Sequence, residues 1–237
     1  MAKDALKEII MEEKNPLYGK KITLNGDSIC QCAGGGYGRI IADRNGMEYQ
    51  NVAIGGGTIT AETYVESTGV KRHWISRTIE KMDEDADYAI VEGGVNDASL
   101  GKLTPPIGKI TKGYGEPLDD TTFIGAFESM LKQLTIRFHG KKIGYIAVHK
   151  MTACYAPECP PEKSFYLVAK LCCQKWGVPF LDLTSQIPPF AYFREDGDPE
   201  LYELRKKYTH NGDGWHPNEE GFKKYYCDKI EAWLKTL

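Results

Sequence analysis

Two short segments at opposite ends of the chain carry residues that could do chemistry together. Ser28 directly follows the apolar run 21–25, and His216 lies three residues after the carboxylate of Asp213. A serine hydroxyl is a weak nucleophile until a base takes its proton, and the base works best when a third group fixes its tautomer and supports its positive charge. The chain contains all three groups in the order serine, aspartate, histidine, which favours a serine hydrolase.

Two glycine-containing turns could supply the hydrogen-bond donors that such a reaction needs. Residues 51–58 include three consecutive glycines, and residues 93–97 include Asn96. In acyl transfer, negative charge develops on the carbonyl oxygen, and removing one donor to it typically raises the barrier by about 2.7–4 kcal/mol. A backbone N–H or an asparagine amide can donate there without adding charge beside the base.

The elements that would position these groups can be inferred from hydrophobic periodicity. Short apolar runs predict buried strands at residues 22–24, 49–54, 88–91, 143–148 and 178–183. Apolar residues at three- and four-residue intervals predict helices over residues 123–138, 165–176 and from Asn218 to the C-terminus. Strands that alternate with helices and are apolar on both faces predict an α/β protein, a three-layer α/β/α sandwich with a mainly parallel central sheet.

The candidate residues follow these predicted elements in a regular way. Ser28, the glycine turn and Asn96 each come directly after a predicted strand. Ligands bind at the carboxyl ends of the strands in open α/β sheets, so these groups are expected on one rim. His216 precedes Pro217 and the last helix, which should hold the imidazole at a helix entry.

Two long stretches do not follow the alternation of strands and helices. Residues 98–120 are rich in glycine, proline and lysine, and residues 188–211 interleave charges with tyrosines. They could form the walls of an active-site cleft or be ordinary surface insertions, and both interpretations stay open. Residues 1–20 are predicted to be an N-terminal extension with a short amphipathic helix, followed by one hydrolase domain over residues 21–237.

Composition restricts the possible partners and location. The 237 residues are 41% hydrophobic and 27% charged, which is ordinary for a globular protein. A formal net charge of −3 provides no basic surface for nucleic acid, and no apolar run approaches the roughly 20 residues of a membrane span. The N-terminus lacks an apolar signal segment, so the chain as written is expected to be cytoplasmic; a chain whose leader had been removed would look the same.

The seven cysteines show no pattern that would bind a metal or form a redox motif. Their number is odd and no pair has CxxC spacing, so we predict reduced, mostly buried thiols. A site built from His139 or His149 with Cys154 and Cys159 would lack any recognised zinc-ligand spacing. No metal and no cofactor are expected.

Taken together, the motifs resemble those of the SGNH (GDSL-type) hydrolases. Four blocks match in order and approximate spacing, and the strand–helix alternation extends over roughly residues 20–237: Gly26-Asp27-Ser28-Ile29, Gly56, Gly94-Val95-Asn96-Asp97 and Asp213-Gly214-Trp215-His216. The resemblance implies a flavodoxin-like α/β/α fold and metal-independent hydrolysis of esters. Ile29 stands where the family usually has leucine, at a position that packs rather than reacts.

The resemblance also implies a role for each candidate residue. It makes Ser28 the nucleophile, His216 the base and Asp213 the group that orients the base. The oxyanion hole would consist of the Ser28 N–H, the Gly56 N–H and the Asn96 side chain. Gly55 and Gly57 are alternatives to Gly56, which counting from the preceding strand favours.

Each motif also has an interpretation without chemistry. Asp27-Ser28 could cap a helix, His216 could be a capping or core histidine, and Asn96-Asp97 could be a turn. The joint presence of four complementary motifs favours catalysis, while Asp27 itself is expected to be structural. The other histidines are expected to be surface or structural residues, although His149 and His210 could lie near the cleft: His73, His139, His149 and His210.

Three other protein classes were compared with the sequence. An α/β-hydrolase would show G-x-S-x-G, but Cys30 takes the last glycine position. A nucleotide-binding turn at residues 34–38 would need a third glycine where Arg39 stands, and no Walker lysine follows. A carbohydrate- or protein-binding domain that keeps the fold without turnover remains the alternative from another class.

The substrate is the least determined part of the prediction. Residues 98–120 are too polar for the apolar lid of an interfacial lipase, which favours a short-chain or acetyl ester. Four aromatic residues could stack on sugar rings, which suggests a carbohydrate ester: Trp215, Tyr37, Trp74 and Tyr114. A lipase, lysophospholipase or thioesterase of the same superfamily is the alternative. The oligomeric state cannot be inferred from the sequence.

Overall fold

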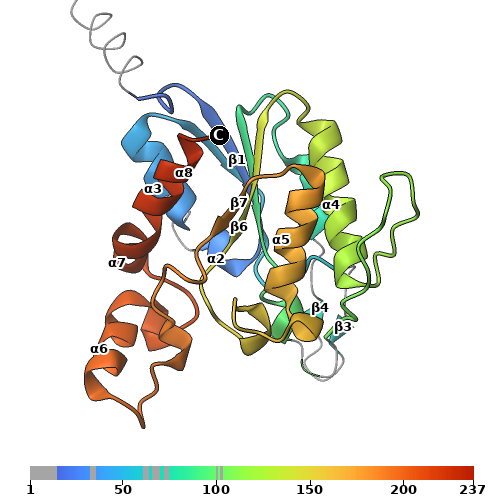
Figure 1. Ribbon diagram of the computed structural model, residues 1–237. Helices are drawn as coiled ribbons and strands as arrows, with labels where there is room; N and C mark the ends of the chain where they lie inside the picture. Colours follow the sequence, from blue (N-terminus) through green and yellow to red (C-terminus); the bar gives the residue numbers. More distant parts are fainter. Residues whose placement is uncertain are drawn as a thin grey trace, which may run out of the picture.

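A parallel sheet with helices on both faces forms the centre of the molecule (Figure 1). The computed structural model describes residues 15–32, 36–60, 64–65, 70–71, 75–99, 101 and 104–237. The sheet has five strands in the order β2-β1-β5-β6-β7, all paired in parallel. Their bounds are β1 Lys21–Asn25, β2 Glu48–Asn51, β5 Tyr88–Glu92, β6 Lys142–Ala147 and β7 Phe180–Asp182. This architecture confirms the predicted α/β/α sandwich.

Helices cover both faces of the sheet. In Figure 1, α3 and α8 lie on one side of the strands, and α4 and α5 lie on the other. The helix bounds are α2 Ser28–Gln31, α3 Gly36–Asn45, α4 Phe123–Arg137, α5 Phe165–Trp176, α6 Pro199–Tyr208, α7 Glu219–Gly221 and α8 Cys227–Leu234. A π-helical turn, Phe222–Tyr226, joins α7 to α8. None of the helices in the described ranges is long and apolar enough to cross a membrane.

Local sequence signals explain where the main helices begin and end. Thr122 caps α4 by accepting a hydrogen bond from the Gly125 N–H, and Ser164 caps α5 through the Leu167 N–H. Gly177 ends α5 in the left-handed conformation, with φ of 65°, which glycine adopts at little cost. The central strand β5 is buried at all five positions. It therefore needs the apolar run that the sequence provides.

The structure decides between the two interpretations of the irregular stretches. Part of residues 98–120 packs against α4 and α5, because Thr111 donates to Glu128 of α4 and the Tyr114 hydroxyl donates to the carbonyl of Lys175 in α5. Residues 188–211 instead reach the site described below and include α6. The expectation that this second stretch is irregular was wrong in part, since Asp198 caps α6 and Pro199 occupies its first turn.

Some predictions fall outside the described residues. The amphipathic helix expected within residues 2–13 is one of them, so the N-terminal extension stays a prediction.

A short antiparallel pair of strands, β3 (Tyr64–Val65) with β4 (Val70–Lys71), is separate from the main sheet.

Candidate active site

Ser28 is the first residue of α2, directly beyond the carboxyl end of β1. Asp27 caps this short helix, because its Oδ1 accepts a hydrogen bond of 2.9 Å from the Ile29 N–H. Asp27 is completely buried. The prediction that Asp27 is structural and bonds within the turn is therefore confirmed, and the helix cap coexists with a serine aimed outward.

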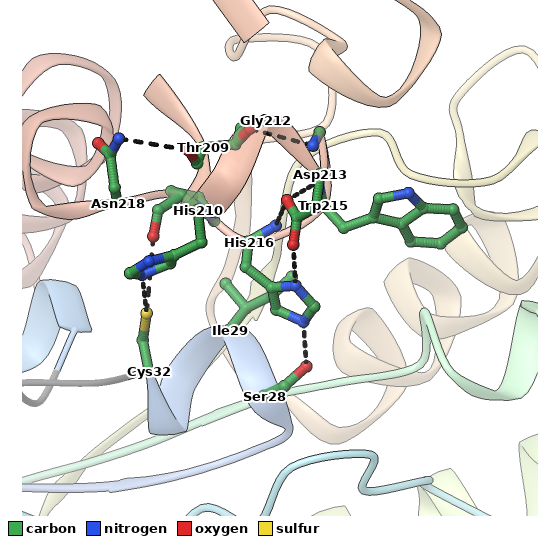
Figure 2. A network of polar contacts seen from close by, with 12 residues as sticks. Ser28, Ile29, Cys32, Thr209, His210, Gly212, Asp213, Trp215, His216 and Asn218 are labelled. Carbon is green, nitrogen blue, oxygen red and sulfur yellow. Dashed lines mark hydrogen bonds and ion pairs between the residues drawn. The ribbon is translucent and has the colours of Figure 1, made fainter. Parts of the chain in front are cut away.

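Ser28, His216 and Asp213 form one hydrogen-bonded series (Figure 2). His216 Nε2 lies 3.0 Å from Ser28 Oγ, and His216 Nδ1 lies 2.6 Å from Asp213 Oδ2. The other carboxylate oxygen of Asp213 accepts the backbone N–H groups of Trp215 and His216, at 2.8 and 2.9 Å. A serine and a histidine separated by 188 positions thus meet on one rim of the sheet.

The surroundings of Asp213 keep its carboxyl ionised. Partial burial acts to raise its pKa, but the backbone N–H and the imidazole of His216, with the Trp215 N–H, outweigh burial and lower the pKa below its ordinary value. A carboxylate next to Nδ1 favours the tautomer in which Nδ1 carries the proton. Nε2 is then free to accept a proton from the Ser28 hydroxyl.

Arg205 of α6 holds the loop that carries Asp213. Its Nε and Nη2 donate to the carbonyls of Gly212 and Asp213 at 2.6 and 2.9 Å, and its Nη1 reaches the carbonyl of Phe193 at 3.3 Å. Gly214 has φ of 75°, and a Cβ there would lie 2.9 Å from Arg205 Nε. This contact was not predicted from the sequence, in which Asp198-Pro199 indicates only where α6 begins.

The glycine turn lies next to Ser28. A Cβ at Gly55 would lie 3.8 Å from Ser28 Cβ. The Gly55 N–H already donates to Gln31 Oε1 at 2.8 Å, and the Gly57 N–H donates to the carbonyl of Ile54 at 3.0 Å. Among the described groups, no acceptor is found for the Gly56 N–H, which makes Gly56 the available donor of the three.

Asn96 lies beside the same turn, and its amide is already engaged. Its Nδ2 donates to the carbonyl of Gly57 at 2.9 Å and to Asp27 Oδ2 at 3.2 Å. The amide is therefore fixed between the glycine turn and the turn that carries Ser28. All five residues assigned from the sequence, namely Ser28, Gly56, Asn96, Asp213 and His216, lie in one region of the structure.

Comparisons with known proteins agree with this arrangement. A model of the GDSL-like Lipase/Acylhydrolase family matches residues 24–224. The chain belongs to this family.

Solved structures share the fold at low sequence identity. A protein from Lactobacillus plantarum is 22% identical, with 92% of this chain and 98% of that chain covered and a TM-score of 0.65. A protein from Bacteroides ovatus described as a GDSL-like lipase is 16% identical, with coverage of 92% and 99% and a TM-score of 0.61. An acetyl xylan esterase is 17% identical, with coverage of 92% and 100% and a TM-score of 0.55. None of the curated proteins compared matches the chain.

This GDSL-family chain has a pocket in front of the serine. The pocket measures about 500 Å³ and is lined by Ser28, Gln31, Cys32, His210 and His216. The lining of a second pocket, of about 640 Å³, includes Arg194, Tyr202 and Arg205. The smaller pocket contains Ser28 and His216 and is therefore the candidate site for substrate.

The predicted aromatic residues have different positions relative to this pocket. Trp215 is 39% exposed and directly precedes His216. Tyr37 is buried, so its predicted stacking on a sugar was wrong, and Tyr114 is exposed and packs against Trp176 at the end of α5. Trp74 lies outside the described residues. Trp215 is thus the one described member of the four that is exposed beside the triad.

Of the remaining histidines, two lie close to the triad. His149 is buried, and its Nδ1 lies 2.6 Å from the Tyr226 hydroxyl. Burial lowers the pKa of His149 to about 4, and a hydrogen bond to the Trp215 backbone only partly opposes this. His149 is therefore neutral and supports the segment 209–217 that carries His210 and His216, which we call the histidine loop. His210 lines the pocket, His139 is exposed, and His73 is outside the described residues.

Glu92, which was not predicted from the sequence, supports the turn that carries Ser28. It ends β5, is completely buried, and its Oε1 accepts the N–H groups of Asp27 and Cys30 at 2.7 and 3.1 Å. A Cβ at Gly26 would lie 2.4 Å from this oxygen, so the turn needs glycine there. Burial, and then the charge of Asp27, raises the pKa of Glu92 well above its ordinary value. The sequence signal for this role is a glutamate at the end of an otherwise apolar strand.

Two substitutions should separate the acceptor function of Glu92 from its charge. Glu92→Gln keeps an oxygen in place of Oε1 and matches the neutral acid, so we expect a melting temperature close to that of the wild type. Glu92→Leu leaves two buried N–H groups without an acceptor, at about 1–3 kcal/mol each, and should unfold at clearly lower temperature. Thermal melts followed by circular dichroism compare them. Equal melting temperatures would contradict this role.

Asp97 fixes the start of the segment that follows the glycine turn. Its oxygens accept the N–H groups of Ile59 and Thr60, both at 2.9 Å, and the Thr60 hydroxyl at 2.6 Å. The carboxyl is fully buried, and burial raises its pKa to about 6 although these hydrogen bonds oppose the change. Asp97 is therefore a structural partner of the second block.

The raised pKa of Asp97 predicts a pH dependence of stability. The folded state holds this proton to about pH 6, whereas the unfolded chain releases it near 3.8. The contribution of Asp97 to the free energy of unfolding is therefore full below pH 3.8 and falls by about 3 kcal/mol as pH rises through 6. Melts of wild type and Asp97→Asn between pH 4 and 7 should show the steeper fall in the wild type. Parallel curves would show that Asp97 does not titrate in this range.

Proposed function

We propose that this GDSL-family protein is a serine esterase that hydrolyses carboxylic esters through an acyl-enzyme. Ser28 is the nucleophile, His216 the general base and Asp213 the group that orients the imidazole. The observation that carries the proposal is the continuous series of contacts, 3.0 Å from Ser28 Oγ to His216 Nε2 and 2.6 Å from His216 Nδ1 to Asp213. This is the distance range in which a base can take a hydroxyl proton.

The geometry supports two chemical steps. Ser28 Oγ attacks the ester carbonyl carbon as its proton passes to His216 Nε2, and the imidazolium then protonates the leaving alcohol, which leaves an acyl group on Ser28. Water enters, gives a proton to the same imidazole, and attacks the acyl carbon; the acid leaves and Ser28 regains its proton. The Asp213 carboxylate stabilises the imidazolium in both steps.

Three donors stabilise the oxyanion. The start of α2 orients the Ser28 N–H. The left-handed conformation of Gly56, whose φ is 75°, orients the Gly56 N–H. Asn96 Nδ2 is the third donor. Its 3.2 Å contact with Asp27 is longer than its 2.9 Å contact with Gly57, so a substrate oxyanion replaces the contact with Asp27. The two backbone donors are fixed in advance and cost little reorganisation during the reaction, whereas Asn96 exchanges one partner for the oxyanion.

The substrate of the proposed reaction is a short-chain or acetyl ester, with a carbohydrate as the alcohol part. Gln31 brings a polar side chain to the lining of the pocket, which suits the hydroxyl groups of a carbohydrate. Trp215 is exposed next to His216 and provides an indole face for a sugar ring. The structural likeness to an acetyl xylan esterase supports the same choice.

An acyl-length series tests the substrate proposal. p-Nitrophenyl esters from acetyl to palmitoyl should give the highest kcat/KM at acetyl or butyryl, because a longer chain cannot be enclosed by the pocket. A maximum at the long end would favour a lipase instead.

A second comparison tests the sugar. Trp215→Ala should raise KM for an acetylated oligosaccharide and leave KM for p-nitrophenyl acetate nearly unchanged. Tyr114→Ala, at an exposed tyrosine that packs against the end of α5, should change neither. Equal effects of Trp215→Ala on both substrates would argue against stacking.

A further inference from the structure

A second pair of a nucleophile and a nitrogen base lies beside the triad. Cys32 Sγ is 3.3 Å from His210 Nε2 and 3.5 Å from the carbonyl of Pro217 (Figure 2). Neither Cys32 nor His210 is used in the proposed ester hydrolysis. A thiol becomes reactive when a neighbouring group accepts its proton, and an imidazole at this distance can do so.

The fold places the two pairs side by side through the same two elements. Cys32 lies one helical turn after the serine, since its N–H donates to the carbonyl of Ser28 at 3.1 Å. In the histidine loop, the His210 N–H donates to the carbonyl of His216 at 2.8 Å, which holds the two histidines next to each other. Ser28 begins α2 and Cys32 directly follows it, and the loop presents His216 and His210. Four of the five residues lining the 500 Å³ pocket belong to these two pairs.

The other thiols are less suited to react. None of the seven cysteines forms a disulfide, which agrees with the prediction of reduced thiols, and five are buried. Burial raises the pKa of each buried thiol: Cys30, Cys159, Cys172, Cys173 and Cys227. Cys154 is the other half-buried thiol, and in the described part of the chain no histidine contact is recorded for it. Partial exposure together with an imidazole partner thus distinguishes Cys32.

We propose that Cys32, paired with His210, is a modification site for small disulfides, and that the mixed disulfide closes the pocket in front of Ser28. The first part stands on the geometry of the thiol and the imidazole. The second part, loss of esterase activity, rests on the proposed function. The site would make the enzyme sensitive to the thiol–disulfide state of its surroundings.

The reaction balances without any additional oxidant. The Cys32 proton passes to His210 Nε2, and Sγ attacks one sulfur of the small disulfide. The new S–S bond forms as the old S–S bond breaks, and the leaving thiolate takes the proton from the imidazolium. Cys32 is oxidised and one half of the small disulfide is reduced to a thiol. A reducing thiol reverses the step.

Because Cys32 and Ser28 line the same pocket, any group attached to Sγ occupies space that a substrate needs.

Intact-mass measurement and peptide mapping after exposure to 2-hydroxyethyl disulfide test the attachment. The folded wild type should gain one group, at Cys32, and lose it on treatment with dithiothreitol. Cys32→Ser should gain none, and the matched control Cys154→Ser should react as the wild type does. His210→Gln should react severalfold more slowly, with folding checked by circular dichroism.

A second readout measures closure of the pocket independently of ester hydrolysis. Carbethoxylation of His216 by diethyl pyrocarbonate, mapped by mass spectrometry, should be slower in the modified wild type than in the unmodified protein. Ser28→Ala should acquire the mixed disulfide at the wild-type rate, so failure of the esterase proposal would leave this result intact. Where esters are hydrolysed, the modified protein should lose activity and regain it on reduction.

Three results would overturn the proposal. Modification of Cys154 before Cys32, or no modification of Cys32 in the folded protein, would remove the site. An unchanged rate in His210→Gln would remove the role of the imidazole. A Cys32 adduct that leaves both the carbethoxylation of His216 and esterase activity unchanged would show that the attached group does not enter the pocket.

Discussion

Replacing Ser28 by alanine should lower kcat for p-nitrophenyl acetate by up to about 10⁶-fold, because the acyl-enzyme can no longer form. The residual rate would come from the remaining oxyanion donors acting on a water molecule. KM should change little, since the methyl side chain leaves the walls of the pocket in place. Steady-state kinetics at pH 8 with protein of matched purity measures the effect.

Ser185 provides a control for the loss of a serine hydroxyl elsewhere. It is exposed, and its hydroxyl contacts Asp182 at the end of β7. Ser185→Ala should retain the wild-type kcat. If Ser28→Ala hydrolysed the ester as fast as the wild type, Ser28 could not be the nucleophile.

Asp213→Asn should lower kcat by about 10⁴-fold, which is the effect of a wrong imidazole tautomer. The backbone N–H groups of Trp215 and His216 require an oxygen at the position of Oδ1. The asparagine must therefore turn its NH₂ group toward His216 Nδ1. Nδ1 then has to accept a hydrogen bond, so the ring proton moves to Nε2. There it faces Ser28 Oγ and blocks proton transfer.

Asp228, an exposed carboxylate on α8 that pairs with Arg44, is the matched control. Asp228→Asn should leave kcat unchanged, while both variants should melt within a few degrees of the wild type. A wild-type kcat in Asp213→Asn would show that the imidazole does not depend on this carboxylate for its orientation.

Much of this site could be predicted because its residues sit at sequence positions that a parallel sheet brings together. Strand β5 is buried throughout, so its apolar run was unambiguous, and the turn carrying Asn96 had to follow it. Likewise, Asp213 and His216 are three residues apart, and one turn of backbone is enough to join them. Local chemistry and the parallel arrangement of strands were sufficient for these parts.

The supporting residues could not be predicted because their contacts are made across the fold. Glu92 reaches the turn at Asp27 across 65 positions, and Cys32 meets His210 across 178. Hydrophobic periodicity contains no information about which turn lies above a given strand end. The route of residues 104–120 was undetermined for the same reason, since a buried pair of Glu128 and Lys175 draws Thr111 toward α4 and α5.

The most direct test of the central claim is to find where an ester-like phosphonate attaches. A p-nitrophenyl alkylphosphonate carrying a short alkyl group reacts with an activated serine and remains bound to it. Peptide mapping by mass spectrometry should find one phosphonyl group per chain on Ser28, at a rate greatly reduced in Asp213→Asn. Attachment at another residue, or no attachment to a protein that hydrolyses the matching ester, would contradict the assignment of Ser28, His216 and Asp213.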